Sequence, residues 1–220
     1  MLPALQELSS SSKRRAAGVR RVIYAGSSSA YGDQPYESKR ESDLPLPLSP
    51  YAAAKLAGEE YCRAFTATYG LETVVIRYFN VFGPRQHPDS EYSAVIPKFV
   101  TAMLRNQSPT VFGDGLQSRD FTFIDNVIAG NLAAATSNEA VGKVINVACG
   151  QQFTLLELVA AINRVLGTRI EPRFSDQRVG DVRSSRADIS VARKVLTYEP
   201  IIGFEEGLRR SIEYYRALGA

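Results

Sequence analysis

The stretch from residue 19 to residue 79 reads as a strand, a helix and a second strand, and this order restricts the fold more than any other feature. The apolar run Val22 to Ala25, which ends in glycine and serine, is typical of a buried strand that leads into a loop. Ser49 and Pro50 favour a helix start, and Gly70 favours its end. The segment LETVVIRYF, rich in β-branched residues, predicts the second strand. Neighbouring strands connected through a helix run parallel, so the sequence predicts an α/β fold with a doubly wound parallel sheet.

The rest of the chain alternates between regular and irregular patterns. Apolar periodicity and caps predict helices over residues 94–104, 125–135, 154–166 and 204–218, and short strands at PTVFG and KVINVA. Residues 170–200 show no clear period and are expected to be irregular. Residues 1–18 combine a short amphipathic piece with a run of serines and a run of basic residues, so we expect an irregular, non-native start there.

Composition excludes several kinds of function. The chain has 220 residues, enough to bury a core as one domain or as one domain with a small lobe. Its net charge of +3 is too small to indicate a nucleic-acid partner. His87 is the single histidine and the two cysteines, Cys62 and Cys149, are far apart, so no metal site is expected. Without a long apolar run or an export leader, we expect no membrane span and predict a cytoplasmic protein with reduced thiols.

Tyr51 and Lys55 lie four residues apart in SPYAAAK, at the start of the first predicted helix. Residues at this spacing share one face of a helix, so the phenol and the ammonium should project side by side. A nearby cation favours a phenolate, which makes this tyrosine a candidate base. Ser27, Ser28 and Ser29 follow the preceding strand and can place a hydroxyl beside the same substrate proton. The spacing alone is common on amphipathic helices, so the neighbouring segments decide what it means.

Those neighbouring segments resemble one family. SSSAYG follows the first strand, the helix begins at a Ser-Pro cap, the next strand ends in RYFNVFGPR, and RDFTFID and GDVRSSRADIS follow in order. From about Val19 to the C-terminus the chain is similar to the extended short-chain dehydrogenases/reductases, in their NAD-dependent epimerase/dehydratase branch. Within that branch it most resembles UDP-N-acetylglucosamine 4-epimerases. The resemblance implies part of a Rossmann-like parallel sheet with a small C-terminal α/β substrate-binding lobe.

The resemblance also divides the chain into two units. Residues 19–83, 117–168 and 204–220 would form the C-terminal half of a Rossmann-like domain, and residues 84–116 and 169–203 the sugar-nucleotide-binding lobe. The N-terminal, cofactor-binding half is expected to be missing, because the sequence contains no GxGxxG or GxxGxxG segment. At roughly 30 residues for each βαβ unit, about 100 residues before Val19 would complete it.

A role for each candidate residue follows from the resemblance. Tyr51 is the general base, Lys55 stabilises its phenolate and binds the nicotinamide ribose, and Ser27 hydrogen-bonds the reacting sugar hydroxyl. NAD is the expected cofactor, and the residues expected to bind it are Tyr51, Lys55, Tyr78 and Phe79. These residues would contact only its nicotinamide end, so we expect weak binding of NAD. The expected UDP-sugar substrate would be bound by Ser28, Ser29, Asn80, Gln86, Ala94, Val95, Thr110, Phe112, Arg119, Arg178, Asp181 and Ser185.

Three serines indicate the branch of the family. Dehydratases of sugar nucleotides carry an Asp-Glu pair where this chain has Ser28 and Ser29, and hydroxyls cannot act as the extra acid and base that elimination of water needs. Ser185 stands where a tyrosine restricts related epimerases to glucose and galactose, and it leaves room for an N-acetyl group. The predicted reaction is 4-epimerisation of UDP-GlcNAc and UDP-GalNAc through a 4-keto sugar. A homodimer through the helix that carries Tyr51 and Lys55 is also implied.

Two alternatives stay open on the sequence. A nucleotide-sugar reductase or dehydratase of the same family would use Ser27, Tyr51 and Lys55 as well. A catalytically inactive remnant that binds a nucleotide-sugar or a partner would keep the same motifs without turnover, and the missing glycine segment favours it. A measurement of turnover with NAD separates these hypotheses.

Overall fold

A computed structural model describes residues 18–36, 38–87, 95–177 and 182–219 of the chain. Its helices are α3 (Pro50–Tyr69), α4 (Val95–Leu104), α5 (Ile124–Thr136), α6 (Leu155–Leu166), α7 (Ser190–Leu196) and α8 (Phe204–Ala217), with the short 3₁₀ helices η1 (Ser28–Tyr31) and η2 (Asn138–Ala140). Its strands are β1 (Arg21–Ser27), β2 (Glu72–Tyr78), β3 (Val81–Phe82), β4 (Thr110–Phe112), β5 (Ser118–Arg119), β6 (Thr122–Phe123), β7 (Val144–Val147), β8 (Phe153–Thr154), β9 (Arg173–Ser175) and β10 (Ser184–Ser185). Within the described ranges, every helix is too short or too polar to cross a membrane.

The main sheet contains β1, β2 and β7 in the order β1-β2-β7, and both strand pairs are parallel. Ser27 lies opposite Tyr78, and Tyr78 lies opposite Val147. The carboxyl ends of the three strands therefore meet at one edge of the sheet. The parallel sheet built on a strand-helix-strand unit, which the sequence predicts, is confirmed.

Local signals place α3 where the sequence predicts it. The side chain of Ser49 accepts a hydrogen bond from the backbone N–H of Ala52, and Pro50 occupies the first helical turn. Gly70 ends the helix in the left-handed region, with a φ of 63° that a side chain would disfavour. Ser49 and Pro50 thus determine the start of the helix, and Gly70 determines its end.

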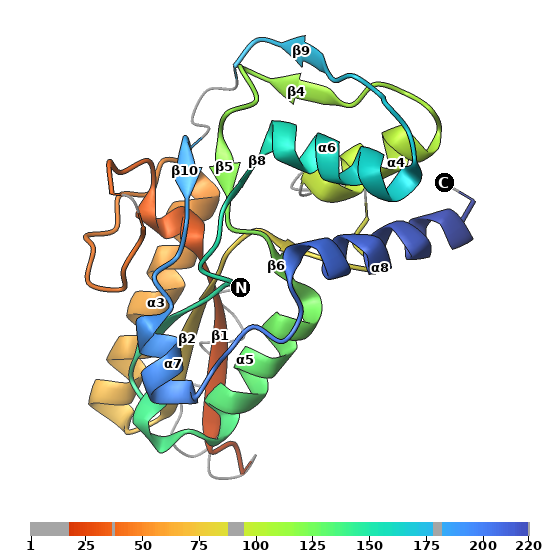
Figure 1. The fold of residues 1–220 in the computed structure, drawn as a ribbon. Helices are drawn as coiled ribbons and strands as arrows, with labels where there is room; N and C mark the ends of the chain where they lie inside the picture. Colours follow the sequence, from red (N-terminus) through yellow and green to blue (C-terminus); the bar gives the residue numbers. More distant parts are fainter. Residues whose placement is uncertain (1–17, 37, 88–94, 178–181, 220) are drawn as a thin grey trace.

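The alternating side chains of β2 explain why helices cover both faces of the sheet (Figure 1). Val75 packs with Tyr24 and Cys62 beneath α3. Val74 and Ile76 point the other way, into a buried cluster that also includes residues of α5 and α7. A strand buried on both faces is typical of a doubly wound α/β sheet.

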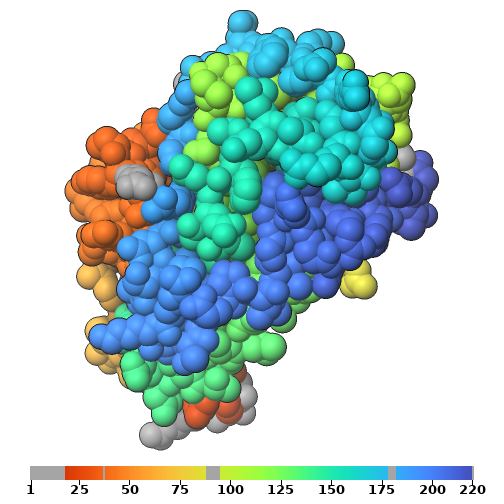
Figure 2. Space-filling model, viewed as in Figure 1, coloured from red at the N-terminus to blue at the C-terminus, as the bar shows by residue number. Residues whose placement is uncertain are grey.

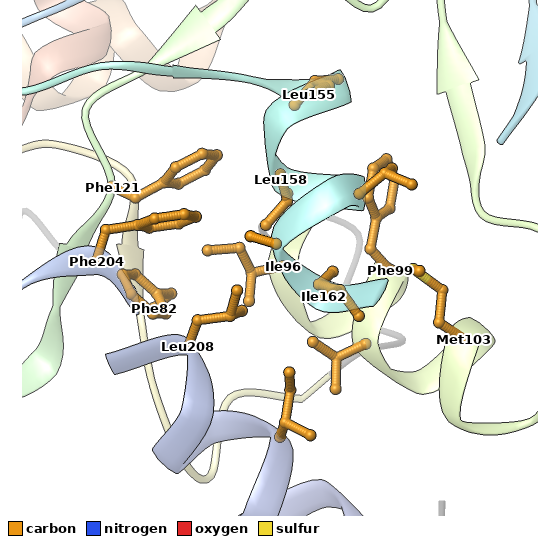
Figure 3. Close-up of a cluster of buried hydrophobic side chains, with 14 of the residues drawn as sticks. Phe82, Ile96, Phe99, Met103, Phe121, Leu155, Leu158, Ile162, Phe204 and Leu208 are labelled. Atoms are coloured by element: carbon orange, nitrogen blue, oxygen red, sulfur yellow. The ribbon is translucent and has the colours of Figure 1, made fainter. Parts of the chain in front are cut away.

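A second buried cluster lies between α4, α6 and α8 (Figure 1). Figure 3 shows the rings of Phe82, Phe121 and Phe204 beside the aliphatic side chains of α6 and α8. The rings of Phe121 and Phe204 are stacked with centroids 5.5 Å apart, and Phe82 meets Phe121 edge-on at 6.3 Å. α6 begins at a capping box formed by Thr154 and Glu157, in agreement with the predicted capped helix. This cluster is the core of a second packed unit beside the sheet.

The helices of the second cluster come from both of the units that the sequence predicts. In the expected division α6 and α8 belong to the Rossmann-like half, and their apolar faces, which include Leu158 and Leu208, pack with α4 in the second cluster. α7 lies in the segment that was expected to be irregular, and that expectation was wrong for these residues: Ala192 and Val195 pack on the main sheet. In the view of Figure 2, the segments of α7 and α8 lie next to each other, between those of α6 and α5. The residue ranges of the two units remain a prediction.

Short strand pairs bring distant segments to the carboxyl edge of the main sheet. β5 pairs in parallel with β10 and antiparallel with β8, so that Arg119 lies opposite Ser185. β3 pairs in parallel with β6, and β4 with β9. Residues of β3, β5 and β10 form part of the wall above the ends of β1 and β2, whereas β4 and β9 lie farther from the main sheet (Figure 1).

Candidate active site

A cavity of about 500 Å³ opens at the carboxyl ends of β1 and β2. Ligands of open parallel α/β sheets bind at this edge. The walls come from β1 and the turn after it, from α3, from the segment after β2, and from β5 and β10. The lining residues are Ala25, Gly26, Ser27, Ser28, Ser29, Gly32, Lys39, Tyr51, Lys55, Tyr78, Phe79, Asn80, Val81, Gln86, Arg119, Val182 and Ser185.

Tyr51 and Lys55 form the part of the wall that α3 contributes. The ammonium of Lys55 lies 5.7 Å from the centre of the Tyr51 ring. Its Nζ donates a hydrogen bond of 2.8 Å to the main-chain oxygen of Ala25. Tyr51 is 43% exposed, so its phenol is accessible to a ligand. An ammonium in this position stabilises negative charge that develops near the phenol oxygen.

Tyr24 is a second tyrosine beside Lys55, with its ring centre 5.6 Å from the ammonium. It is buried, and burial together with the charges of Cys62 and Glu59 raises the pKa of Tyr24 to about 12. Its phenol therefore stays protonated near neutral pH. Of the two tyrosines next to the ammonium, Tyr51 is the one suited to act as a base.

The serine triplet forms a tight turn at the end of β1. Ser27 caps η1, since its Oγ accepts the backbone N–H of Ser29 at 3.2 Å and the hydroxyl of Ser29 at 2.8 Å. All three serines line the cavity. Because Ser29 donates its hydroxyl proton to Ser27, its oxygen can only accept a hydrogen bond from a ligand. Ser29 can therefore bind a substrate only through a donor group of that substrate.

Asn80 and Ser185 meet on the opposite wall. Asn80 has a φ of 34°, in the left-handed region that few residues other than glycine adopt. Its Nδ2 donates hydrogen bonds to the Ser185 hydroxyl at 2.9 Å and to the main-chain oxygen of Asp120 at 3.2 Å. Gln86, from the same segment, donates through Nε2 to the main-chain oxygen of Val81 at 3.2 Å. This wall is therefore polar and built from segments far apart in the sequence.

Asp120 ties the loops behind that wall together. Its carboxylate is completely buried and accepts the backbone N–H groups of Cys149, Gly150 and Ala187 at distances of 3.0, 3.0 and 3.1 Å. Burial raises the pKa of Asp120 to about 7, although the three N–H donors favour its carboxylate. The side chain thus joins β5 to β10 and to the loop after β7. No pattern in the sequence distinguishes it from a surface carboxylate.

A second cavity of about 580 Å³ continues from the first, because Asn80 and Arg119 line both. Arg173 on β9 adds a positive side chain, and its Nη2 donates to the hydroxyl of Thr110 at 3.2 Å. The remaining lining combines apolar rings with polar and basic groups: Val95, Lys98, Phe99, Ala102, Gln107, Ser108, Pro109, Phe112, Gln117, Phe121 and Leu155. The two joined cavities suit an elongated ligand that has an apolar group at one end and negative charge in its middle.

Most of the predicted site residues come together. Ser27, Ser28, Ser29, Tyr51, Lys55, Tyr78, Phe79, Asn80, Gln86, Arg119 and Ser185 line the first cavity, and Val95, Thr110 and Phe112 line the second. Phe79 is completely buried against the ring of Tyr31, so it backs the wall and offers no exposed side chain to a cofactor. Ala94, Arg178 and Asp181 lie outside the described residues. Which group of the cofactor or substrate each of these residues binds stays a prediction.

Lys39 is a cavity residue that sequence reasoning missed. It is only 2% exposed, and its Nζ donates to the main-chain oxygen of Gln34 at 2.6 Å. Burial lowers the pKa of Lys39, and this effect exceeds that of the nearby charges of Asp33 and Asp43, which raise the pKa. In the sequence it belongs to the polar run YESKRESD, which resembles a solvated loop, so no signal marks it as buried.

The first cavity offers hydrogen-bond donors that suit the hydroxyls of a ribose. An ammonium has three donors, and Lys55 directs one of them to Ala25, so others can reach ribose hydroxyls. The hydroxyl of Tyr78 donates to Oδ1 of Asn131 at 2.8 Å, so Tyr78 can offer a cofactor its ring but not its proton. The described residues of the first cavity could therefore hold a ribose and an adjoining ring of a cofactor such as NAD.

Comparison with known proteins identifies a family for this architecture. Residues 6–148 match the model of the NAD dependent epimerase/dehydratase family. A UDP-glucose 4-epimerase of Mycolicibacterium smegmatis is 38% identical over 204 residues, which cover 92% of this chain and 64% of the relative. YtcB of Bacillus subtilis, an uncharacterized UDP-glucose epimerase, is 32% identical over 217 residues, which cover 99% of this chain and 66% of the relative. The chain thus spans 64% and 66% of the length of these two relatives.

Solved structures agree with this match. The UDP-N-acetylglucosamine 4-epimerase of Methanobrevibacter ruminantium M1, in complex with UDP-N-acetylmuramic acid, superposes with a TM-score of 0.90 at 40% identity, over 98% of this chain and 68% of that one. A mutant UDP-glucuronic acid 4-epimerase of Bacillus cereus, in complex with a fluorinated UDP-glucuronic acid and NAD, gives a TM-score of 0.90 at 32% identity, over 99% and 67%. NAD is also present in a UDP-glucose 4-epimerase of Thermus thermophilus, so it is the cofactor of this family.

Proposed function

Because the chain belongs to the NAD dependent epimerase/dehydratase family, we propose that its two joined cavities bind a UDP-hexose and that Ser27, Tyr51 and Lys55 act in the 4-epimerisation of that sugar. The observation that carries the proposal is the position of these three residues on the first cavity, at the carboxyl edge of the sheet. The proposal concerns the activity of the whole protein, because the chain spans about two thirds of the length of the relatives.

Each side chain has a chemical part in this reaction. The phenolate of Tyr51 removes the proton of the sugar hydroxyl that becomes a ketone. Lys55 stabilises the charge near that oxygen and holds a ribose, while Ser27 gives a hydrogen bond to the reacting oxygen. NAD, when bound, supplies a hydride acceptor that returns the hydride to the opposite face of the sugar.

The second cavity suits the nucleotide. Arg119 lies where the two cavities join, so a diphosphate at this point would place the sugar in the first cavity and the base in the second. The half-buried ring of Phe112 supplies apolar surface for a base, and the buried rings of Phe99 and Phe121 lie behind the same wall. Lys98 and Arg173 add positive charge along the same path.

The preferred sugar is the finer part of the proposal. We assign UDP-GlcNAc and UDP-GalNAc, because the small side chain of Ser185, held by Asn80, leaves space on the first cavity that a tyrosine would fill. Support comes from the 40% identity to a UDP-N-acetylglucosamine 4-epimerase, whereas other similar structures contain UDP-glucuronic acid. Replacement of Ser185 by tyrosine should therefore weaken the binding of UDP-GlcNAc more than that of UDP-glucose, as measured by calorimetric titration. Equal losses for both sugars would contradict the assignment.

Turnover of the purified chain tests the reaction. With NAD and UDP-GalNAc, the wild-type chain should form UDP-GlcNAc if it holds the complete site, and proton NMR of the anomeric signals detects this product. Tyr51→Phe should lower the rate by at least about 100-fold, since it removes the proton acceptor and little volume. Tyr69→Phe is the matched control, because it changes an exposed tyrosine at the other end of α3.

The outcomes separate the open alternatives. Activity that survives in Tyr51→Phe would refute the assignment of the base. Binding of UDP-GlcNAc without turnover by the wild-type chain would favour the inactive, nucleotide-sugar-binding alternative. Water elimination from the sugar would point to a dehydratase, for which Ser28 and Ser29 offer no acid or base.

A further inference from the structure

Hydrogen bonds inside the serine turn determine what Ser27 can do. Its Oγ accepts two of them, from the backbone N–H of Ser29 at 3.2 Å and from the hydroxyl of Ser29 at 2.8 Å. A serine oxygen has two acceptor positions and one proton. Both acceptor positions of Ser27 are therefore filled within the turn, and only its proton is left for another partner.

The residues after Ser29 hold this arrangement in place. Ala30 and Tyr31 are completely buried. The hydroxyl of Tyr31 donates to Oδ1 of Asn146 at 2.8 Å, and its ring centre lies 4.4 Å from the guanidinium carbon of Arg77. A turn anchored in a close-packed core cannot rotate to present the other side of Ser27 without breaking these contacts.

We propose that Ser29 is a positioning residue that makes Ser27 a hydrogen-bond donor only, with its proton directed to the reacting oxygen of the sugar. The remaining proton must leave the turn, and the space beside Ser27 is the cavity that Tyr51 and Lys55 share. This inference rests on the proposed function, because it names the sugar of that reaction as the acceptor.

The consequence is a single path for the proton. The O–H bond of the sugar breaks, and its proton forms an O–H bond with the phenolate oxygen of Tyr51. Ser27 has no free acceptor position, so it cannot relay the proton. The hydrogen bond from Ser27 persists when the hydroxyl oxygen becomes a ketone oxygen, because both are acceptors, and it stabilises charge on that oxygen during the transfer.

Binding to the full chain without cofactor tests the role of Ser29. UDP and UDP-GlcNAc are titrated by calorimetry into wild type, Ser29→Ala, Ser29→Thr and Ser42→Ala. Ser29→Ala should raise the Kd of UDP-GlcNAc roughly three- to tenfold, because a hydrogen bond is lost or weakened, and should leave the Kd of UDP within about twofold. Ser29→Thr keeps the hydroxyl and should restore the affinity. Ser42 lies exposed in a loop, so Ser42→Ala is the matched control.

A general loss of packing in Ser29→Ala would weaken UDP and UDP-GlcNAc alike, and that result would overturn the proposal. Unchanged binding of UDP-GlcNAc in Ser29→Ala would overturn it too. Under turnover with NAD, Ser29→Ala should lower kcat more than it changes KM, with recovery in Ser29→Thr.

Neutron diffraction from deuterium-exchanged crystals of the full chain tests the same inference without any ligand. A Ser27 deuteron directed into the cavity supports it, and a deuteron directed at Ser29 Oγ overturns it. Failure of the proposed function would look different, because the wild-type chain would then bind no UDP-GlcNAc or bind it without turnover, while the deuteron position would still decide the orientation of Ser27.

Discussion

The ion pair between Arg77 and Glu59 lies in the core, between β2 and α3, and removal of either member should strongly destabilise the fold. Arg77 donates to the Glu59 carboxylate through Nε at 3.1 Å to both oxygens and through Nη2 at 2.7 Å. Both residues are 3% exposed. Burial disfavours the charged guanidinium, but the hydrogen bonds with Glu59, the interaction with Tyr31 and the charge of Glu59 together outweigh burial and raise the pKa of Arg77.

The structure indicates how large the effect should be. In Glu59→Met, the buried guanidinium loses the carboxylate with which it forms its hydrogen-bonded ion pair, and among the described residues its Nη1 is already a buried atom without a hydrogen-bond partner. Breaking a buried pair on one side costs about 3 to 5 kcal/mol, because an uncompensated charge stays buried. In the double variant Glu59→Met/Arg77→Met no charge is left, so its free energy of unfolding should lie within about 2 kcal/mol of wild type, including the lost contact of Arg77 with Tyr31.

Urea unfolding followed by circular dichroism measures these values, and it suits a chain without tryptophan. Glu60→Met is the matched control, because Glu60 is the next residue of α3 and its partner Arg63 is exposed. The reasoning is refuted if Glu59→Met costs no more than Glu60→Met. It is equally refuted if the losses of the two single variants add up in the double variant.

Asp120 and Gly58 yield two further predictions. Burial raises the pKa of Asp120 in the folded state from 3.8 to about 7. Between these two pH values the folded state keeps a proton that the unfolded state has lost, so the free energy that this proton adds to stability falls as the pH rises from about 4 to 7. From pH 5 to pH 8 the wild-type free energy of unfolding should drop by roughly 2 to 3 kcal/mol more than that of Asp120→Asn, and parallel urea-derived profiles would contradict this. In Gly58→Ala, the new Cβ would lie 2.1 Å from the Tyr24 hydroxyl, so the variant should lose about 1 to 3 kcal/mol despite the better helix propensity of alanine. A melting temperature at or above that of wild type would show that the Tyr24 ring moves aside.

Local signals explain which parts of the fold are predictable from the sequence. The ends of α3 depend on Ser49, Pro50 and Gly70, which act on backbone groups within a few residues. The placement of Tyr51 beside Lys55 depends only on the helical spacing of four residues. The capped start of α6 is a local contact of the same kind.

Contacts between distant segments explain what was missed. α7 has a short apolar face that shows little period alone, and its packing on the main sheet fixes it as a helix. The apolar faces of α6 and α8 could pack on the main sheet or on α4, and the sequence of each helix does not indicate which of the two it covers. Lys39 resembles a solvated lysine until its loop is placed against the segment after β10.

The sequence alone determined the strand-helix-strand unit, the ends of its helix, the Tyr51–Lys55 pair and the resemblance to a family, because each depends on residues close together along the chain or on an ordered set of motifs. Only the tertiary structure brought Ser185 to Asn80, joined the carboxylate of Asp120 to backbone N–H groups of two distant segments, and paired Arg77 with Glu59. Those contacts join segments far apart in the chain, and they exist because the packed elements exclude water and leave each buried polar group to find its partner within the protein.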